Sequence, residues 1–173
     1  GGQAMSTEAS ISAEKPVRPD IRPKFISHGT LASRDLEKTR KFYEEFLHLD
    51  VVRTSPISMM VRLGGEHVYA VVQSKEEFLM PRLNHNGLDV DSDVDVDEAW
   101  RTVQASAEQW GLTRITRPVA QHGTYSFMFW DFDGNCWEIL SNPRGGYRWI
   151  FEKGDQEGRG HLDRNFRQAR PAD

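Results

Sequence analysis

The chain of 173 residues is long enough for one domain with a hydrophobic core. Hydrophobic residues make up 38%, mean hydropathy is −0.64 and no apolar run approaches a membrane span, so we expect no membrane partner. The net charge of −4 argues against nucleic acid as the main partner. The single cysteine excludes an internal disulfide, and the N-terminus lacks a secretory signal pattern, so we expect a cytoplasmic protein.

Residues 1–24 are expected to lie outside the folded domain. Residues 1–4 precede the first methionine and are interpreted as an expression remnant. The polar stretch that follows contains three prolines and few apolar anchors. This composition predicts a flexible or extended arm.

The first predicted unit comprises residues 25–73. The helix in it is amphipathic, with apolar residues three and four positions apart, and either Ser33 or Asp35 is a suitable N-cap. Gly64-Gly65 predicts a tight turn between its last two strands. The predicted elements are a strand at 25–32, a helix at 35–49, and strands at 51–54, 57–63 and 68–73.

The same order of elements returns in residues 83–141. Gly111 ends the second helix, and the Asp-Gly pair at 133–134 predicts a hairpin between the last two strands. The chain is therefore predicted to be an α+β protein of two tandem βαβββ units that form a cupped mixed sheet around a metal site. Residues 142–173 form an extension that packs either over the sheet or on a second subunit. The predicted elements of this unit are a strand at 83–90, a helix at 96–110, and strands at 112–119, 125–131 and 135–141.

Three side chains in these segments suggest a metal site. His28 and His85 occupy equivalent places in the two units, and Glu138 lies in the last strand between apolar neighbours. A buried carboxylate must be paired or bound to metal, and two imidazoles with one carboxylate form the facial triad of non-haem iron sites. Taken singly, each histidine could be a hydrogen-bonded core residue, and Glu138 could pair with Arg62 or Arg114. Their joint occurrence favours the metal.

Two segments resemble the vicinal oxygen chelate superfamily. Residues 27–43, which open Ser-His-Gly-Thr-Leu, are similar to the start of its members. Residues 131–138 are similar to the family's Asp-Pro-Asp-Gly-Asn…Glu signature, with Phe132 in place of proline. The family includes glyoxalases, extradiol dioxygenases, fosfomycin-resistance transferases and bleomycin-binding proteins. The resemblance covers residues 25–141 and implies that His28, His85 and Glu138 are the metal ligands.

The ligand set indicates a reaction. Glyoxalase I-like members take a fourth ligand, a carboxylate, from the fourth strand. Residues 68–73 contain no Asp or Glu, and only Gln73 or His67 could substitute. Three protein ligands leave about three open positions on an octahedral ion, which suits a bidentate catecholate and dioxygen. We therefore expect an extradiol-type dioxygenase that cleaves a catechol-like substrate with Fe(II), although Mn, Zn or Ni remain options.

The resemblance also implies further site residues. His122 is similar to the acid–base histidine of extradiol dioxygenases. The family's tyrosine is replaced by Met128, so Tyr125 is the candidate for its place, and Trp149 is a second candidate contact for an aromatic substrate. The alternatives are a lyase, isomerase or epimerase with a Lewis-acid metal, and a non-catalytic antibiotic-binding protein. A homodimer is one option for the assembly.

Overall fold

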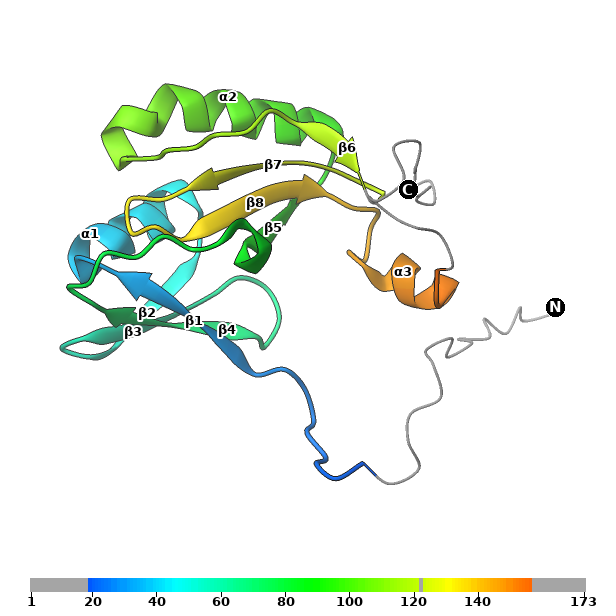
Figure 1. Cartoon of the computed structure of the whole chain (residues 1–173), viewed down its shortest axis with the longest axis horizontal. Helices are drawn as coiled ribbons and strands as arrows, with labels where there is room; N and C mark the ends of the chain where they lie inside the picture. Colours follow the sequence, from blue (N-terminus) through cyan, green and yellow to red (C-terminus); the bar gives the residue numbers. More distant parts are fainter. Residues whose placement is uncertain (1–18, 122, 157–173) are drawn as a thin grey trace, which may run out of the picture.

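The computed structural model describes residues 19–121 and 123–156 (Figure 1). As predicted, the fold is α+β, with two four-stranded mixed sheets in the strand orders β1-β4-β3-β2 and β5-β8-β7-β6. Within these residues, no helix has the length and apolar character needed to cross a membrane. The elements are β1 (His28–Ser33), α1 (Leu36–Lys41), η1 (Phe42–Phe46), β2 (Asp50–Ser55), β3 (Ser58–Arg62), β4 (Val68–Gln73), η2 (Arg82–Asn84), β5 (Asn86–Val90), α2 (Asp93–Trp110), β6 (Val119–Gln121), β7 (Thr124–Trp130), β8 (Cys136–Ser141) and α3 (Arg148–Lys153).

The helix of the first unit is shorter and less regular than the sequence predicts. Asp35 is the N-cap, and its carboxylate accepts a hydrogen bond from the backbone N–H of Lys38. After Lys41 the helix widens into the π-helical turn η1, and the helical segment ends before His48, whose φ of 58° is left-handed. The aromatic rings of Phe42 and Phe46 stack on one face of this turn.

The second unit differs from the prediction at three boundaries. The helix α2 begins at Asp93, because Ser92 caps it and aspartates in its first turn favour the positive helix end. The predicted strand at 112–119 is reduced to an isolated bridge at Thr113 and the short strand β6. His85 is not inside a strand: it follows the 3₁₀ turn η2 and directly precedes β5.

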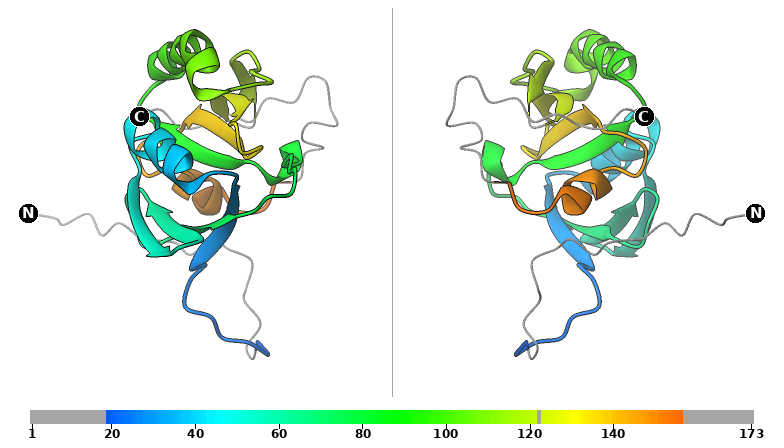
Figure 2. Two further views of the ribbon diagram at one scale, coloured as in Figure 1. Left: turned by 90° about the vertical axis from the view of Figure 1, so that its left-hand side faces the viewer. Right: turned by 90° about the vertical axis from the view of Figure 1, so that its right-hand side faces the viewer.

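The two units share one hydrophobic core on the helix side of both sheets. Figure 2 shows α1 and α2 on the same side of the sheets, and the ring centroid of Trp110 lies 5.7 Å from that of Phe42. Tyr43 packs edge-on against Trp137 of β8. Since side chains alternate along a strand, the neighbouring Glu138 faces away from this core.

The turn between β7 and β8 holds the two units together. Its Asp133 accepts hydrogen bonds from the backbone N–H of Arg34 and from the hydroxyl of Thr39. Asn135 bonds both the N–H and the carbonyl of Ala32, so β1 is tied to the start of β8. Phe132, which stands in the family's proline position, lies under the ammonium of Lys38 at 4.5 Å.

Candidate metal centre

Glu138 and His85 form the centre of the candidate site. The carboxylate lies in the middle of β8 with only 8% of the residue exposed, and the hydroxyl of Ser126 on β7 donates to its Oε2 at 3.2 Å. The Nε2 atom of His85 lies 3.8 Å from the same oxygen. The sequence predicted Glu138 as a buried carboxylate that needs a partner, and within the described residues its partners are a histidine and a serine rather than an arginine.

The tautomer of His85 decides whether its Nε2 atom, which faces Glu138, can bind a cation. Its Nδ1 atom lies 2.6 Å from the backbone carbonyl of Arg82. Because a carbonyl only accepts hydrogen bonds, Nδ1 must carry the hydrogen. In the neutral ring, Nε2 then has no hydrogen and carries a free lone pair. A lone pair facing a carboxylate oxygen is repulsive unless a cation, either a proton or a metal ion, lies between them. This is the ligand arrangement found in metal sites, where the second ring nitrogen donates to a carbonyl.

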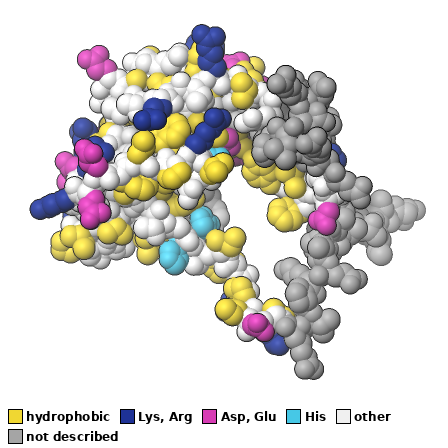
Figure 3. All heavy atoms as spheres, viewed as in Figure 1, with side chains coloured by type: hydrophobic (Ala, Val, Ile, Leu, Met, Phe, Trp, Pro, Cys, Tyr) yellow, Lys and Arg dark blue, Asp and Glu magenta, His cyan; other side chains and the backbone are white. Residues whose placement is uncertain are grey.

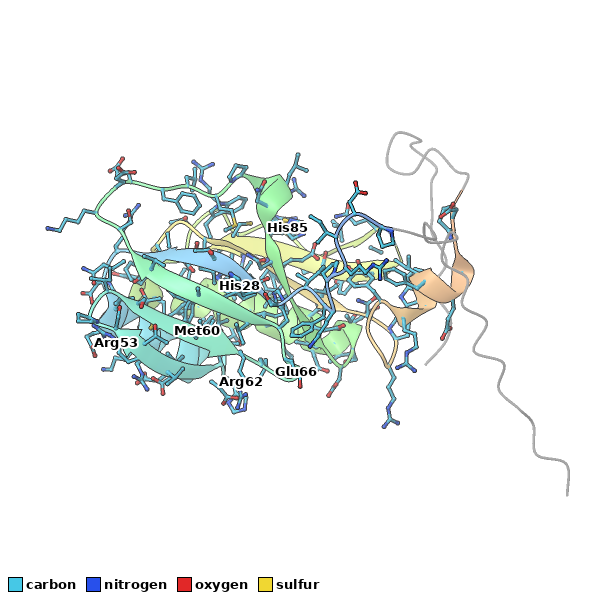
Figure 4. The ribbon with its side chains drawn as sticks, turned by 90° about the horizontal axis from the view of Figure 1, so that it is seen from below. His28, Arg53, Met60, Arg62, Glu66 and His85 are labelled. Atoms are coloured by element: carbon cyan, nitrogen blue, oxygen red, sulfur yellow. The ribbon has the colours of Figure 1, made fainter. Side chains whose placement is uncertain are left out.

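His28 is placed apart from this pair. It opens β1 as an exposed residue, and its Nδ1 atom pairs with the Ser27 hydroxyl at 2.8 Å, which leaves Nε2 for a ligand role. Across residues 19–121 and 123–156 there is no group of three His, Cys, Asp or Glu side chains that could hold one metal ion. Figure 4 shows His28 on the first sheet and His85 beside the second. One copy of the chain therefore assembles two of the three predicted ligands.

The register of the strands shows which residue stands where a fourth ligand, a carboxylate, would lie. In the second unit Gly87, two residues after His85, is paired with Glu138. In the first unit Thr30, two residues after His28, is paired with Ala70. Alanine thus occupies the position where the first unit would carry its own carboxylate. The two substitutes considered above are also poorly placed, since His67 bonds the Ile26 carbonyl and Gln73 is paired with Ser33 at the far end of β1.

The predicted substrate and acid–base residues have different outcomes. Tyr125 does not face the candidate site: its hydroxyl donates to Asp97 of α2 at 2.6 Å, because it alternates with Ser126 along β7. Trp149 lies in α3, is 5% exposed, and donates from Nε1 to the side chain of Asn142, so it anchors the helix. His122 lies outside the described residues.

Sequence reasoning missed two residues of this region. Ser126 is identified only once the register of β7 is known, because Met128 lies directly across from Glu138 and Ser126 shares the face of Met128. Tyr147 precedes α3 and belongs to no recognisable motif. The pKa of its phenol is raised, first by burial and then by the nearby charge of Glu138.

The geometry agrees with a comparison to known proteins. A family model described as the Glyoxalase/Bleomycin resistance protein/Dioxygenase superfamily matches residues 25–139. The chain belongs to this superfamily. Its members bind small molecules and are mostly metalloenzymes, so the comparison supports divalent metal binding without choosing the metal or the reaction. Among curated proteins, none matches the chain significantly.

Solved structures show the same fold at low sequence identity. A possible glyoxalase from Bacillus cereus is 21% identical with a TM-score of 0.56, over 68% of this chain and 99% of that one. A variant of the fosfomycin resistance protein FosX from Listeria monocytogenes, in complex with Mn(II) and 1S,2S-dihydroxypropylphosphonic acid, is 20% identical with a TM-score of 0.56, over 68% and 90%. Lactoylglutathione lyase from Agrobacterium tumefaciens is 18% identical with a TM-score of 0.51, over 69% and 94%.

Proposed function

We propose that this superfamily member is a divalent-metal enzyme whose substrate binds the metal through two adjacent oxygen atoms. His28, His85 and Glu138 are the protein ligands. The observation that carries the proposal is the pair of acceptor atoms, Nε2 of His85 and Oε2 of Glu138, held 3.8 Å apart by fixed partners. When bound, the metal supplies Lewis acidity and lowers the pKa of the substrate's hydroxyl groups.

The chain's own residues prepare the site for this ion. The Arg82 carbonyl keeps His85 in the tautomer whose Nε2 is a ligand, and the Ser126 hydroxyl holds Oε2 of the carboxylate. Ala70 stands where a fourth ligand, a carboxylate, would lie. With three protein ligands, about three coordination positions would remain for the substrate and a second reactant.

Within this class our specific hypothesis is ring cleavage of a catechol-like substrate with Fe(II) and dioxygen. It rests on the three-ligand set and on His122 as the group that moves protons. The second candidate is Lewis-acid chemistry on a substrate with vicinal oxygens, and the FosX complex with Mn(II) and a dihydroxy phosphonic acid favours it. Oxygen uptake with a panel of catechols separates the two.

We further propose that the third ligand comes from a second copy of the chain. Within the part of the chain that the structure describes, no helix covers the face of the first sheet that carries His28, and this face includes the exposed apolar side chains of Val52, Met60 and Val72. Figure 3 shows exposed hydrophobic side chains, in yellow, over this unit. An uncovered apolar face is typical of a protein–protein contact. Such a contact would bring the His28 of one copy to the His85–Glu138 pair of the other.

The metal proposal is tested by titrating metal-free protein with Mn(II) and with Fe(II) under nitrogen. His85→Ala and Glu138→Ala should each lower metal affinity by at least about tenfold, because a ligand is lost. Glu66→Ala removes an exposed carboxylate on the first unit and should leave affinity unchanged. Equal affinities in Glu138→Ala and the parent protein would refute the site, and a parent protein that binds neither metal would favour a non-catalytic binding role.

A further inference from the structure

A hydrogen bond joins the two units next to both proposed histidine ligands. The hydroxyl of Tyr69 on β4 donates to the side-chain oxygen of Asn86, the first residue of β5, at 2.5 Å. In the first sheet Tyr69 is paired with Gly29, the residue after His28. Asn86 is the residue after His85. One side chain therefore connects the start of the strand that carries His28 to the start of the strand that follows His85.

The ring of Tyr69 is held by its contacts beside β1. A Cβ atom on Gly29 would lie 2.6 Å from a ring carbon of Tyr69, so the ring lies directly against the backbone of Gly29. Since side chains alternate along β1, this face is opposite to the one that carries His28. His67 packs edge-on against the ring with the centroids 5.1 Å apart, and its Nδ1 atom lies 3.0 Å from the Ile26 carbonyl. The tyrosine therefore supports the start of β1 from the side away from the proposed ligand.

Side-chain packing alone does not fix the two units at this place. A cavity of about 190 Å³ lies between them, and its lining includes Leu63 and Tyr69 from the first unit and Leu88 and Trp137 from the second. Beyond the other end of β1, Asp133 ties the units through its own hydrogen bonds. Burial raises the pKa of the Tyr69 phenol, which therefore keeps its hydrogen and remains a donor. The bond to Asn86 thus fixes the units where their packing is incomplete.

We propose that Tyr69 is a positioning residue for the metal centre, whose hydrogen bond to Asn86 fixes the orientation of the two units that His28 and His85 need to bind one ion. The inference rests on the proposed function. It holds for ligands from one chain or from two, because the orientation of the units determines where both histidines lie in every copy. Tyr69 acts through the neighbouring histidines and does not contact the ion.

The test compares two hydrogen bonds between the units, one beside each end of β1. Tyr69→Phe keeps the ring and removes the bond to Asn86. Thr39→Val removes a hydroxyl that donates to Asp133, far along β1 from His28. Mn(II) affinity of the metal-free, full-length protein is measured by EPR under nitrogen, and stability by thermal unfolding. Both variants should lose stability, but only Tyr69→Phe should bind Mn(II) more weakly, by about fivefold, which corresponds to roughly one hydrogen bond.

Gly29→Ala reaches the same hydrogen bond by a second route. The added Cβ would displace the ring of Tyr69 without changing any proposed ligand, so Mn(II) affinity should fall about as far as in Tyr69→Phe. Because both changes break one hydrogen bond, their effects should not add. The double variant should bind Mn(II) about as tightly as the weaker of the two single variants.

The outcomes separate the inference from the function on which it rests. Unchanged Mn(II) affinity in Tyr69→Phe, or an equal loss in Tyr69→Phe and Thr39→Val, would overturn the inference while the metal site stands. Additive losses in the double variant with Gly29→Ala would also overturn it, because the two changes would then act independently. A parent protein that binds no Mn(II) would refute the proposed function, and the inference would fail with it.

Discussion

Buried carboxylates serve two different purposes in this protein. Glu138 faces a histidine lone pair and fits a cation, whereas Asp131 and Asp133 are surrounded by neutral donors. Asp131 accepts from two backbone N–H groups and from the indole of Trp137. Burial raises the pKa of Asp131 to about 7 and that of Asp133 to about 6. The turn between β7 and β8 therefore pairs hydrogen-bond donors with carboxyls that hold protons at unusually high pH.

This difference predicts a pH dependence of stability. The folded pKa values lie above the unfolded value of 3.8, so the folded protein binds more protons between about pH 4 and pH 7. The free energy of unfolding should fall as pH rises through this window. Asp131→Asn removes one titrating group, and we expect the fall between pH 5 and pH 8 to shrink by on the order of 2 kcal/mol. Urea unfolding at several pH values measures it.

The slope, and not the absolute stability, is the informative quantity in that experiment. An asparagine keeps one acceptor oxygen but turns an amide N–H₂ toward the Trp137 indole, so the variant should be less stable at every pH. Glu66→Gln neutralises an exposed carboxylate and serves as the control. Parallel curves for Asp131→Asn and the parent protein would contradict the prediction.

At the residue scale, the sequence is most informative where a charged group sits among apolar neighbours. Glu138 is predicted correctly as buried and partnered because its flanking residues cannot face solvent. Tyr125 is placed wrongly because its face depends on the register of β7, which no local pattern reports. The position of Tyr147 depends on contacts of α3 with distant strands, so it could not be derived from sequence at all.

At the scale of elements, the sequence locates the units better than their ends. The tandem order of strands and helices is correct because hydrophobic periodicity follows burial. Tertiary contacts decide the ends. Residues 112–119 pair at Thr113 and again at Val119, where β6 begins, and the 3₁₀ turn at Arg82–Asn84 precedes His85. Of the candidate ligands, His28 and His85 lie at the beginning of strands, where pattern reading is least accurate, whereas Glu138 lies within β8.

The helix α3 provides a prediction at this scale. Trp149→Ala removes the buried ring and its hydrogen bond to Asn142, so α3 should leave the sheet. We expect amide exchange in residues 148–153 to become at least about tenfold faster, while β7 and β8 stay protected.

Phe151→Ala gives the matched control for that experiment. Phe151 lies in the same helix and is 68% exposed, so its loss removes little packing. Amide exchange in residues 148–153 should resemble that of the parent protein. Similar exchange in Trp149→Ala and Phe151→Ala would show that other contacts hold α3.

At the scale of the whole molecule, the placement of the ligands has a structural cause. The helix sides of both sheets share one core, in which Tyr43 packs on Trp137, and the proposed ligands lie on the faces turned away from it. The sequence predicts His28 and His85 at equivalent positions, but it does not report how the two units are packed. If a second chain supplies His28, as we propose, C₂ symmetry would provide two identical sites per dimer.

Mixing two inactive variants tests this assembly. His28→Ala and Glu138→Ala should each lose tight Mn(II) binding. In a mixed dimer, the intact His28 of one copy meets the intact Glu138 of the other, so an equimolar mixture after subunit exchange should recover about one quarter of the parent sites. A mixture of His85→Ala with Glu138→Ala should recover none, because both ligands belong to the same half of the site. No recovery in the first mixture, despite exchange demonstrated by mass spectrometry, would refute a metal site shared between two copies.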